Sequence, residues 1–574
     1  MNIIVNDNGF HTHGALLKRK AYERLKEGGE ASVSIELSVN KLIGEPESYA
    51  ISKTEKGYSI AGSDELGLYH GIGKFLHTAS WGEDSFTPSE PTGKTVTPAC
   101  SFRAVYFAVH LYNWYANAPT EELERYIEDL MLWGYNTIVL IIPVIDIYSY
   151  EDELAVNAIS KSRSIFKLAK KLGMKVGIIV CVNQGLRGAP AELAADPSFD
   201  PIGNVRGNAG MNICPSKEGA VEYLREVWDG MLRQYVDIGL DYILTWPYDE
   251  GGCGCADCRP WGAKAYCDLA IKFHEDTLKY YPDHKFILSC WIFDKPDDQG
   301  EYSGLYERLK GDMSWVDYIM VDAHGDFPTY PLEHEVIKPI VNFPEISMWK
   351  LYPWGGYGAT PLPERFHRIW NSAKHILSGG MPYSEGMYED ISKVQVAAYY
   401  WEPDRDVWDI MKEYINFEFP SECVEETIEI IKGLEKNHTL VGEYNEPDVE
   451  TALRVGRLAR KVEDKLPLWA KTSWRWRIIY IRAILDAKRF FYYREAGMHG
   501  KDDLNDVRHC AADFLVEDAE SQALIAELRR HYHSSEFNGR NQFTLPFLGG
   551  RTVVGGSPMR NPSRVKHIDW KKFN

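Results

Sequence analysis

The chain has 574 residues, of which 44% are hydrophobic and 26% charged, and its formal net charge is −19. This composition is typical of a globular protein, and the length exceeds what a single core supports, so we expect roughly two to four domains. The acidic balance disfavours nucleic acid and anionic membrane surfaces as partners. No uncharged apolar run is long enough to span a bilayer, and the N-terminus lacks the features of a signal peptide. We therefore expect a cytoplasmic protein. The alternative is a secreted protein whose signal peptide has been removed.

Residues 1–95 alternate strand and helix signals, which predicts a small α+β domain. The segment 32–39 alternates with the period of a strand, and the segment 49–61 is expected to form a hairpin. A helical pattern follows at 64–77. The stretch 85–98 is rich in Pro, Thr and Ser, which is typical of a linker.

From residue 96 to about 420 the pattern becomes strand, polar loop and amphipathic helix, repeated. The first of these helices carries the apolar stripe of a helix that packs on a sheet, at Leu123, Tyr126, Ile127, Leu130 and Met131. Eight strands are expected, at 104–110, 137–142, 175–182, 242–244, 286–291, 316–322, 345–349 and 380–385. Eight such units predict an α/β fold of the (β/α)8 TIM-barrel type. An open doubly wound sheet is the alternative, disfavoured because no Gly-rich phosphate fingerprint follows the first strand.

Residues 421–574 are predicted to form an all-helical C-terminal domain, because the strand signals stop after about Tyr414. Long helical patterns follow at 423–437, 449–466, 473–496 and 506–533.

The stretch from Asp241 to Cys258 is the most unusual part of the sequence. A short apolar strand ends in two adjacent carboxylates, Asp249 and Glu250, and a Gly-rich loop follows. This is the usual layout of an active site in an α/β fold.

In a TIM barrel the C-terminal ends of the strands surround the active site. Glycoside hydrolysis needs two carboxyl groups there, together with aromatic rings and polar side chains that bind the sugar. The expected catalytic residues are Asp249, Glu250, Asp322, Glu345 and Glu385. The expected substrate-binding residues are His110, Asn113, Asn183, Trp246, Trp291, His324, Trp349, Trp354 and Tyr383. Any one of the carboxylates could instead cap a helix or pair with Lys or Arg.

The three-part order resembles the β-N-acetylhexosaminidase and α-glucuronidase groups of glycoside hydrolases, which place a small α/β domain ahead of a TIM barrel. Residues 57–62 with 67–72 resemble the end of that N-terminal domain. The pair Asp249 and Glu250 resembles the hexosaminidase signature. This resemblance implies that Glu250 is the general acid and that Asp249 orients the substrate's acetamido group as the nucleophile.

The stretch from 380–386 to 397–403, followed by helices, is closer to the α-glucuronidase layout. In that family the acid comes from strand four and the base-side carboxylates from later strands. By position, these would be Glu250, Asp322 and Glu345.

The sequence thus predicts an exo-acting glycoside hydrolase that acts on a carbohydrate without a catalytic cofactor. A hexosaminidase-like activity comes first, an α-glucuronidase-like activity second and a non-catalytic carbohydrate-binding protein third. A metal-dependent deacetylase would need ligands that only His110, His324 and Asp322 offer. A homo-oligomer is left open.

Three cysteines, Cys253, Cys255 and Cys258, follow the carboxylate pair with the spacing of metal ligands. Cys214 is the candidate for a fourth ligand, because loops three and four are neighbours on a barrel rim. Thiolate-only ligation predicts a structural zinc that braces the loop carrying Asp249 and Glu250. The alternative is a group of reduced thiols in a Gly-rich turn. This cysteine loop belongs to neither family pattern.

Overall fold

The computed structural model describes residues 1–28, 31–82, 84–109, 113–142, 144, 147–199, 212–248, 251–295, 298–323, 325–346, 351–352, 359–440, 445–509, 514–531, 533 and 565–573. Several predicted site residues lie outside these ranges, namely His110, Asp249, Glu250, His324, Trp349 and Trp354. For Asp322 the backbone is described but the side chain is not. None of the helices in the described ranges combines the length and the apolar character needed to cross a membrane.

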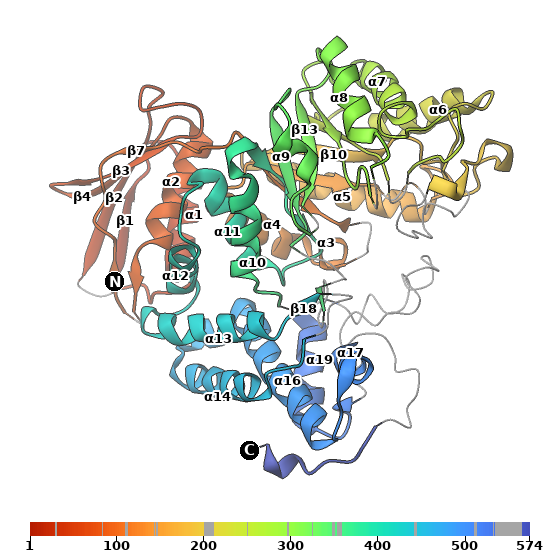
Figure 1. The fold of residues 1–574 in the computed structure, drawn as a ribbon. Coiled ribbons are helices and arrows are strands. Elements are labelled where there is room, and N and C mark those ends of the chain that lie inside the picture. The colour runs from red at the N-terminus through yellow and green to blue at the C-terminus, as the bar shows by residue number, and fades with distance from the viewer. Residues whose placement is uncertain are drawn as a thin grey trace.

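The N-terminal part is a five-stranded sheet in the order β1-β2-β4-β3-β7, with helices packed against it (Figure 1). Its elements are β1 (Asn2–Asn6), α1 (His11–Tyr22), β2 (Ser32–Val39), β3 (Tyr49–Thr54), β4 (Gly57–Gly62), α2 (Glu65–His77) and β7 (Thr95–Val96). The predicted hairpin is confirmed, because β3 and β4 pair antiparallel. The linker prediction for 85–98 is partly wrong, because β7 lies within it and adds a strand to the edge of this sheet.

The central part is a closed barrel of eight parallel strands, as the sequence predicts. The strands are β8 (Phe102–Phe107), β9 (Thr137–Ile141), β10 (Lys175–Cys181), β11 (Tyr242–Trp246), β12 (Lys285–Ser289), β13 (Tyr318–Ala323), β14 (Ile340–Pro344) and β16 (Leu377–Gly380). The last strand, β16, pairs with both β14 and β8, which closes the barrel. The strands are nearly continuous apolar runs because both of their faces are buried.

Two strands of the barrel start earlier in the chain than predicted. The seventh strand is β14, because the apolar run that begins at Ile340 is buried on both faces, and Glu345 follows this strand instead of starting it. Pro344 lies within β14 and pairs with Ala323, Glu345 adds an isolated bridge to Tyr383, and residues 347–349 of the predicted strand lie outside the described ranges. The eighth predicted strand is divided into β16 and the short β17 (Tyr383–Ser384), with Pro382 between them.

Helices cover the outside of the barrel (Figure 1). They include α4 (Thr120–Leu132), α5 (Glu153–Lys171), α6 (Ala220–Arg233), α7 (Ala265–Thr277), α8 (Glu301–Gly311), α10 (Pro363–Ala373) and α11 (Asp390–Trp401). The predicted apolar stripe of α4 is buried along its whole length. A short helix, α3 (Trp114–Asn117), precedes α4.

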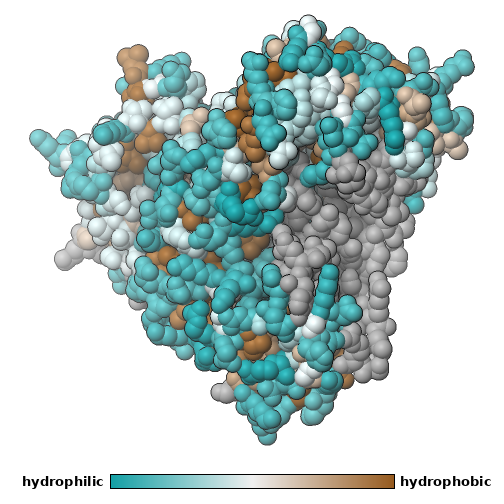
Figure 2. Space-filling model, in the orientation of Figure 1, coloured by the Kyte–Doolittle hydropathy of each residue, from teal (hydrophilic) through white to brown (hydrophobic). Residues whose placement is uncertain are grey.

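Helices also form the C-terminal part, which lies below the barrel in Figure 1. They are α13 (Val424–Lys436), α14 (Val449–Lys465), α16 (Trp474–Glu495), α17 (Gly500–His509) and α19 (Ala519–His531), while the preceding helix α12 (Val407–Glu418) packs against α2, α10 and α11. The prediction of one helix over 506–533 is wrong. Asp518 accepts a hydrogen bond from the Ser521 N–H and starts a new helix, α19. Strands also continue beyond Tyr414, since β18 (Thr439–Leu440) pairs with β15 (Leu351–Tyr352). Figure 2 shows that hydrophilic residues cover most of the described surface on the face of the molecule that Figure 1 presents.

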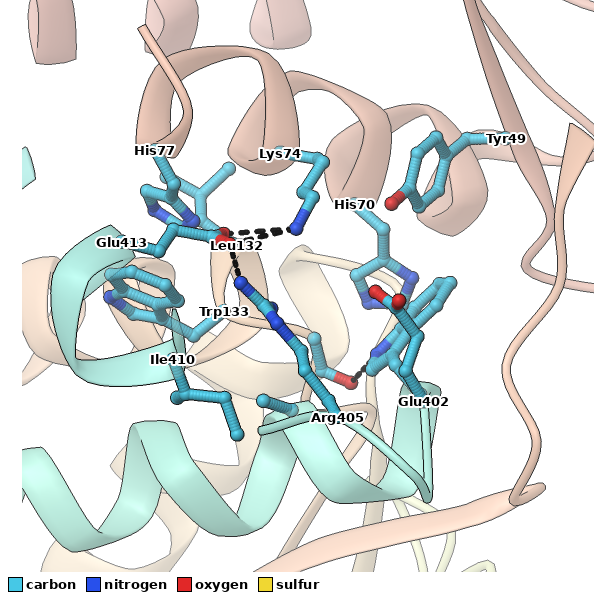
Figure 3. A pocket seen from close by; sticks show the side chains of 13 residues that line it. Tyr49, His70, Lys74, His77, Leu132, Trp133, Glu402, Arg405, Ile410 and Glu413 are labelled. Carbon is cyan, nitrogen blue, oxygen red and sulfur yellow. Dashed lines mark hydrogen bonds and ion pairs between the residues drawn. The ribbon is translucent and has the colours of Figure 1, made fainter. Parts of the chain in front are cut away.

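The N-terminal sheet domain meets the barrel along α2, and we call the contact between them the domain seam (Figure 3). Helix α2 approaches so closely that a Cβ at Gly73 would lie 2.0 Å from the Leu132 carbonyl oxygen. Beside it, Lys74 pairs with Glu413 of α12 at 2.8 Å, and Arg405 pairs with the same carboxylate. Burial opposes ionisation of Glu413, but these two cations outweigh it and lower the pKa of Glu413 to about 2. The cavity that these side chains line is about 40 Å³, which is room for only a few water molecules.

Candidate active site

Several predicted site residues meet at one edge of the barrel, which we call the barrel mouth: Trp246, Trp291, Glu345, Tyr383 and Glu385. Trp246 ends β11, Trp291 follows β12, and Glu345 follows β14. Tyr383 lies in β17, and Glu385 follows that strand. Because all of these strands are parallel, their C-terminal ends lie on the same side of the barrel.

Aromatic rings pack against one another at the barrel mouth. The rings of Trp246 and Trp291 lie 5.3 Å apart at an angle of 30°. Phe343 joins them at 4.9 Å from Trp246 and continues the cluster to Tyr383 at 5.8 Å. Tyr106 of β8 lies 5.4 Å from Tyr383. Phe343 and Tyr106 are residues that the sequence did not single out, since inside an apolar strand they look like ordinary core positions.

The two carboxylates of the barrel mouth are buried and accept hydrogen bonds from aromatic side chains. Glu345 is 5% exposed and accepts from Nε1 of Trp291 at 3.2 Å. Glu385 is 1% exposed and accepts from the Tyr383 hydroxyl at 2.9 Å. Burial raises the pKa of Tyr383 well above its ordinary value, and the neighbouring Glu385 raises it further. The phenol therefore stays protonated and remains a donor to the carboxylate.

A buried ion pair fixes the backbone next to Glu385. Glu389 accepts hydrogen bonds from the Glu385 N–H and from the Ser384 hydroxyl, both at 3.0 Å. Lys393 lies 3.3 Å from the Glu389 carboxylate, and neither side chain has any exposed surface. Lys393 also donates to the Tyr126 hydroxyl at 2.6 Å. Glu389 and Lys393 are not among the predicted site residues, although their spacing of four residues at the start of a helical pattern is typical of an ion pair on a helix.

The two asparagines predicted to bind substrate make hydrogen bonds to the backbone. Nδ2 of Asn183 donates to the carbonyl oxygens of Ile213 and Gly252, and its Oδ1 accepts from the Gly252 N–H at 2.9 Å. Asn113 caps α3 by accepting from the Tyr115 N–H, and it donates to the Ala108 carbonyl. These contacts hold loops in place, and substrate binding stays a prediction for both residues.

Glu301 links the loops that follow β11 and β12, a role that no local sequence pattern indicates. It accepts hydrogen bonds from the Tyr248 hydroxyl, from the Gly262 N–H at 2.9 Å and from the Asp294 N–H at 3.0 Å. Burial raises the pKa of Glu301. Tyr248 is the described residue immediately before Asp249 and Glu250, so this contact anchors the loop at the point where the carboxylate pair begins.

The four cysteines predicted to share a metal lie together, and we call them the cysteine cluster: Cys214, Cys253, Cys255 and Cys258. Their sulfur atoms all lie within 4.8 Å of one another. Sγ of Cys214 is 3.7 Å from that of Cys255 and 3.8 Å from that of Cys258. A hydrogen bond with the Cys258 thiol lowers the pKa of Cys253 to about 5, while burial raises the pKa of Cys214.

The sequence matches no protein-family model, and no curated protein matches it. Solved structures do resemble it. A GH138 enzyme that targets pectin rhamnogalacturonan II shares 13% identity at a TM-score of 0.55, over 92% of this chain and 74% of that one. A GH89 enzyme from Clostridium perfringens, solved with its substrate GlcNAc-alpha-1,4-galactose, shares 12% identity at a TM-score of 0.54, over 91% of this chain and 65% of that one. At such identities the likeness shows a shared fold.

Proposed function

We propose that the protein is an exo-acting glycoside hydrolase whose active site is the barrel mouth. The observation that carries this proposal is the presence of two buried carboxylates, Glu345 and Glu385, beside the ring pair of Trp246 and Trp291. Carboxyl groups supply the acid and the base or nucleophile of glycoside hydrolysis. Aromatic rings bind the apolar faces of sugars. The similar solved enzymes support the proposal through their fold alone.

In the hexosaminidase-like mechanism, Glu250 protonates the leaving oxygen and Asp249 orients the substrate's acetamido group. A general acid must hold its proton near neutral pH, and an ionised Asp249 beside it would favour this through like-charge repulsion. Glu385 or Glu345 would then act across the sugar as a base or as a ligand for hydroxyl groups.

An α-glucuronidase-like activity is the second candidate, with Glu250, Asp322 and Glu345 as the carboxylates. The position of Glu345 favours it, because the shifted β14 places this residue at the C-terminal end of its strand. The two candidates differ in the substituent that the sugar must carry, an acetamido group or a carboxylate.

A panel of nitrophenyl glycosides that includes N-acetylhexosaminides and glucuronides tests the proposal. Release of nitrophenol from one class would identify the activity and choose between the two candidates. Carbohydrate binding without turnover of any substrate in the panel or of natural oligosaccharides would instead indicate a non-catalytic carbohydrate-binding protein.

The proposed acid is tested by the Glu250→Gln variant on two leaving groups. An activated aryl leaving group needs little protonation, so the variant should keep more activity on it than on a sugar leaving group. Asp249→Asn should lose activity on both. A Glu250→Gln variant near wild type on both substrates would place the acid elsewhere.

A further inference from the structure

We propose that the cysteine cluster is a structural zinc site that joins the loop before α6 to the loop after β11. This site is separate from the proposed reaction, because four thiolates complete the coordination shell and leave no position for substrate. The proposal rests on the positions of the four sulfur atoms, on their surroundings and on the two chain segments that supply them.

The sulfur positions fit one zinc ion. Four sulfurs at the usual zinc–sulfur distance of about 2.3 Å in a tetrahedron are about 3.8 Å apart. Sγ of Cys214 lies 3.7 Å from Sγ of Cys255 and 3.8 Å from Sγ of Cys258, and all four sulfurs lie within 4.8 Å. A disulfide, at about 2.05 Å, is much shorter.

The surroundings of the sulfurs are suited to holding thiolates. Cys214, Cys253 and Cys258 are at most 2% exposed, while Cys255 is partly exposed. The Asp196 N–H donates to Sγ of Cys253 at 3.4 Å, and the Ser216 hydroxyl lies 3.0 Å from Sγ of Cys214. Polar groups around the ligands orient them and favour the deprotonated form that binds the metal.

The two segments are already linked in ways that a metal would reinforce. The Gly254 N–H donates to the Asp196 carbonyl at 2.9 Å, and Asn183 binds the backbone of Gly252 and of Ile213. Cys214 follows Ile213 directly, and Cys253 follows Gly252. Zinc would therefore fasten the loop within three residues of Glu250, which gives it a positioning role for the carboxylate pair.

Metal analysis of the full-length wild-type protein, purified under reducing conditions without chelator and dialysed against metal-free buffer, tests the site. We expect about one zinc per chain. The Cys255→Ser variant should retain much less zinc, and Cys255 is chosen because it is the most exposed of the four. The matched control is Cys267→Ser, which alters a buried cysteine of α7 outside the cluster and should retain zinc as the wild type does.

Cobalt titration of the reduced, metal-free wild type provides a second measurement that does not depend on any variant or on activity. Tetrahedral thiolate ligation should give intense sulfur-to-cobalt charge-transfer absorption, and zinc should displace it. Three results would overturn the proposal: wild-type protein without zinc that gives no such absorption, a disulfide within the cluster found by mass spectrometry, or equal zinc loss in Cys255→Ser and Cys267→Ser.

Discussion

The carboxylates of the barrel mouth are buried and the Glu413 side chain at the domain seam is 9% exposed, but these acids have different neighbours. At the seam, Glu413 lies between the cations Lys74 and Arg405, which lower its pKa to about 2. At the mouth, Glu345 and Glu385 accept hydrogen bonds from Trp291 and Tyr383, side chains without charge.

The difference in neighbours indicates which of these acids can take part in catalysis. A carboxylate held between two cations has its charge neutralised and keeps neither proton nor basicity available. The carboxylates of the mouth lie beside aromatic rings of the kind that bind the apolar faces of sugars, which suits them to the proposed reaction. We therefore assign Glu413 to stability and the acids of the mouth to the proposed reaction.

The largest effect is expected for Glu345→Gln. The amide keeps the size of the side chain but cannot act as a base or stabilise positive charge, so kcat should fall by roughly 10²–10⁴-fold. The free energy of unfolding should change little by comparison. Steady-state kinetics on the glycoside that the wild type cleaves would measure kcat, and urea unfolding would measure the free energy of unfolding. Full activity in this variant would remove Glu345 from the site.

The Lys393→Met variant tests whether the pair of Glu389 and Lys393 positions Glu385. Removing a fully buried partner leaves Glu389 uncompensated and should lower the free energy of unfolding by roughly 3–5 kcal/mol. Because Glu389 also holds the backbone of Glu385, we expect kcat to fall about tenfold with little change in KM. Assays well below the Tm of the variant separate the two effects. An unchanged kcat in the folded variant would show that the pair serves stability alone.

The Glu413→Gln variant should lose stability and keep its activity, which is the opposite of the result expected for Glu345→Gln. It should lower the free energy of unfolding by roughly 2–3 kcal/mol, less than for a fully buried pair because 28% of the Lys74 side chain is exposed. The kcat of the folded variant should match that of the wild type, because the seam lies outside the proposed site. Denaturant unfolding and steady-state kinetics on the same preparation measure both quantities.

The smallest expected effect is the pH dependence of the difference in unfolding free energy between the wild type and Glu413→Gln. The pKa of Glu413 is lower in the folded protein than its ordinary value of 4.5, so its contribution to stability is complete above about pH 5. The contribution should decline as the pH falls from 4.5 towards 2. The gap in unfolding free energy between wild type and Glu413→Gln should therefore narrow below pH 4.5. A gap that is as wide at pH 3.5 as at pH 7 would contradict the ion-pair account.

The barrel could be predicted because its signals are local. Apolar runs mark strands that are buried on both faces, and the stripe from Leu123 to Met131 marks a helix that covers them. Two strand boundaries were predicted wrongly, because β14 begins at Ile340 and β16 at Leu377, before the predicted starts. Which residues of an apolar run form the strand depends on strand pairing, which the sequence does not show.

The candidate site could be predicted only in part, for a similar reason. Trp246, Trp291 and Tyr383 lie at or near strand ends, and strand ends are readable from the sequence. The roles of Asn113 and Asn183 depend on which carbonyl groups the folded loops bring within reach. No local pattern could distinguish an amide that binds the backbone from one that binds a sugar.

The measurement that tests the central claim most directly is the kcat of the Glu385→Gln variant on the nitrophenyl glycoside that the wild type cleaves best. The substitution keeps the shape of the side chain and its acceptor for the Tyr383 hydroxyl, so the variant should fold and unfold like the wild type. If the barrel mouth is the active site, kcat should fall by about 100-fold or more while Glu413→Gln keeps wild-type turnover. Wild-type turnover in Glu385→Gln, with its stability intact, would contradict the assignment of the active site to the barrel mouth.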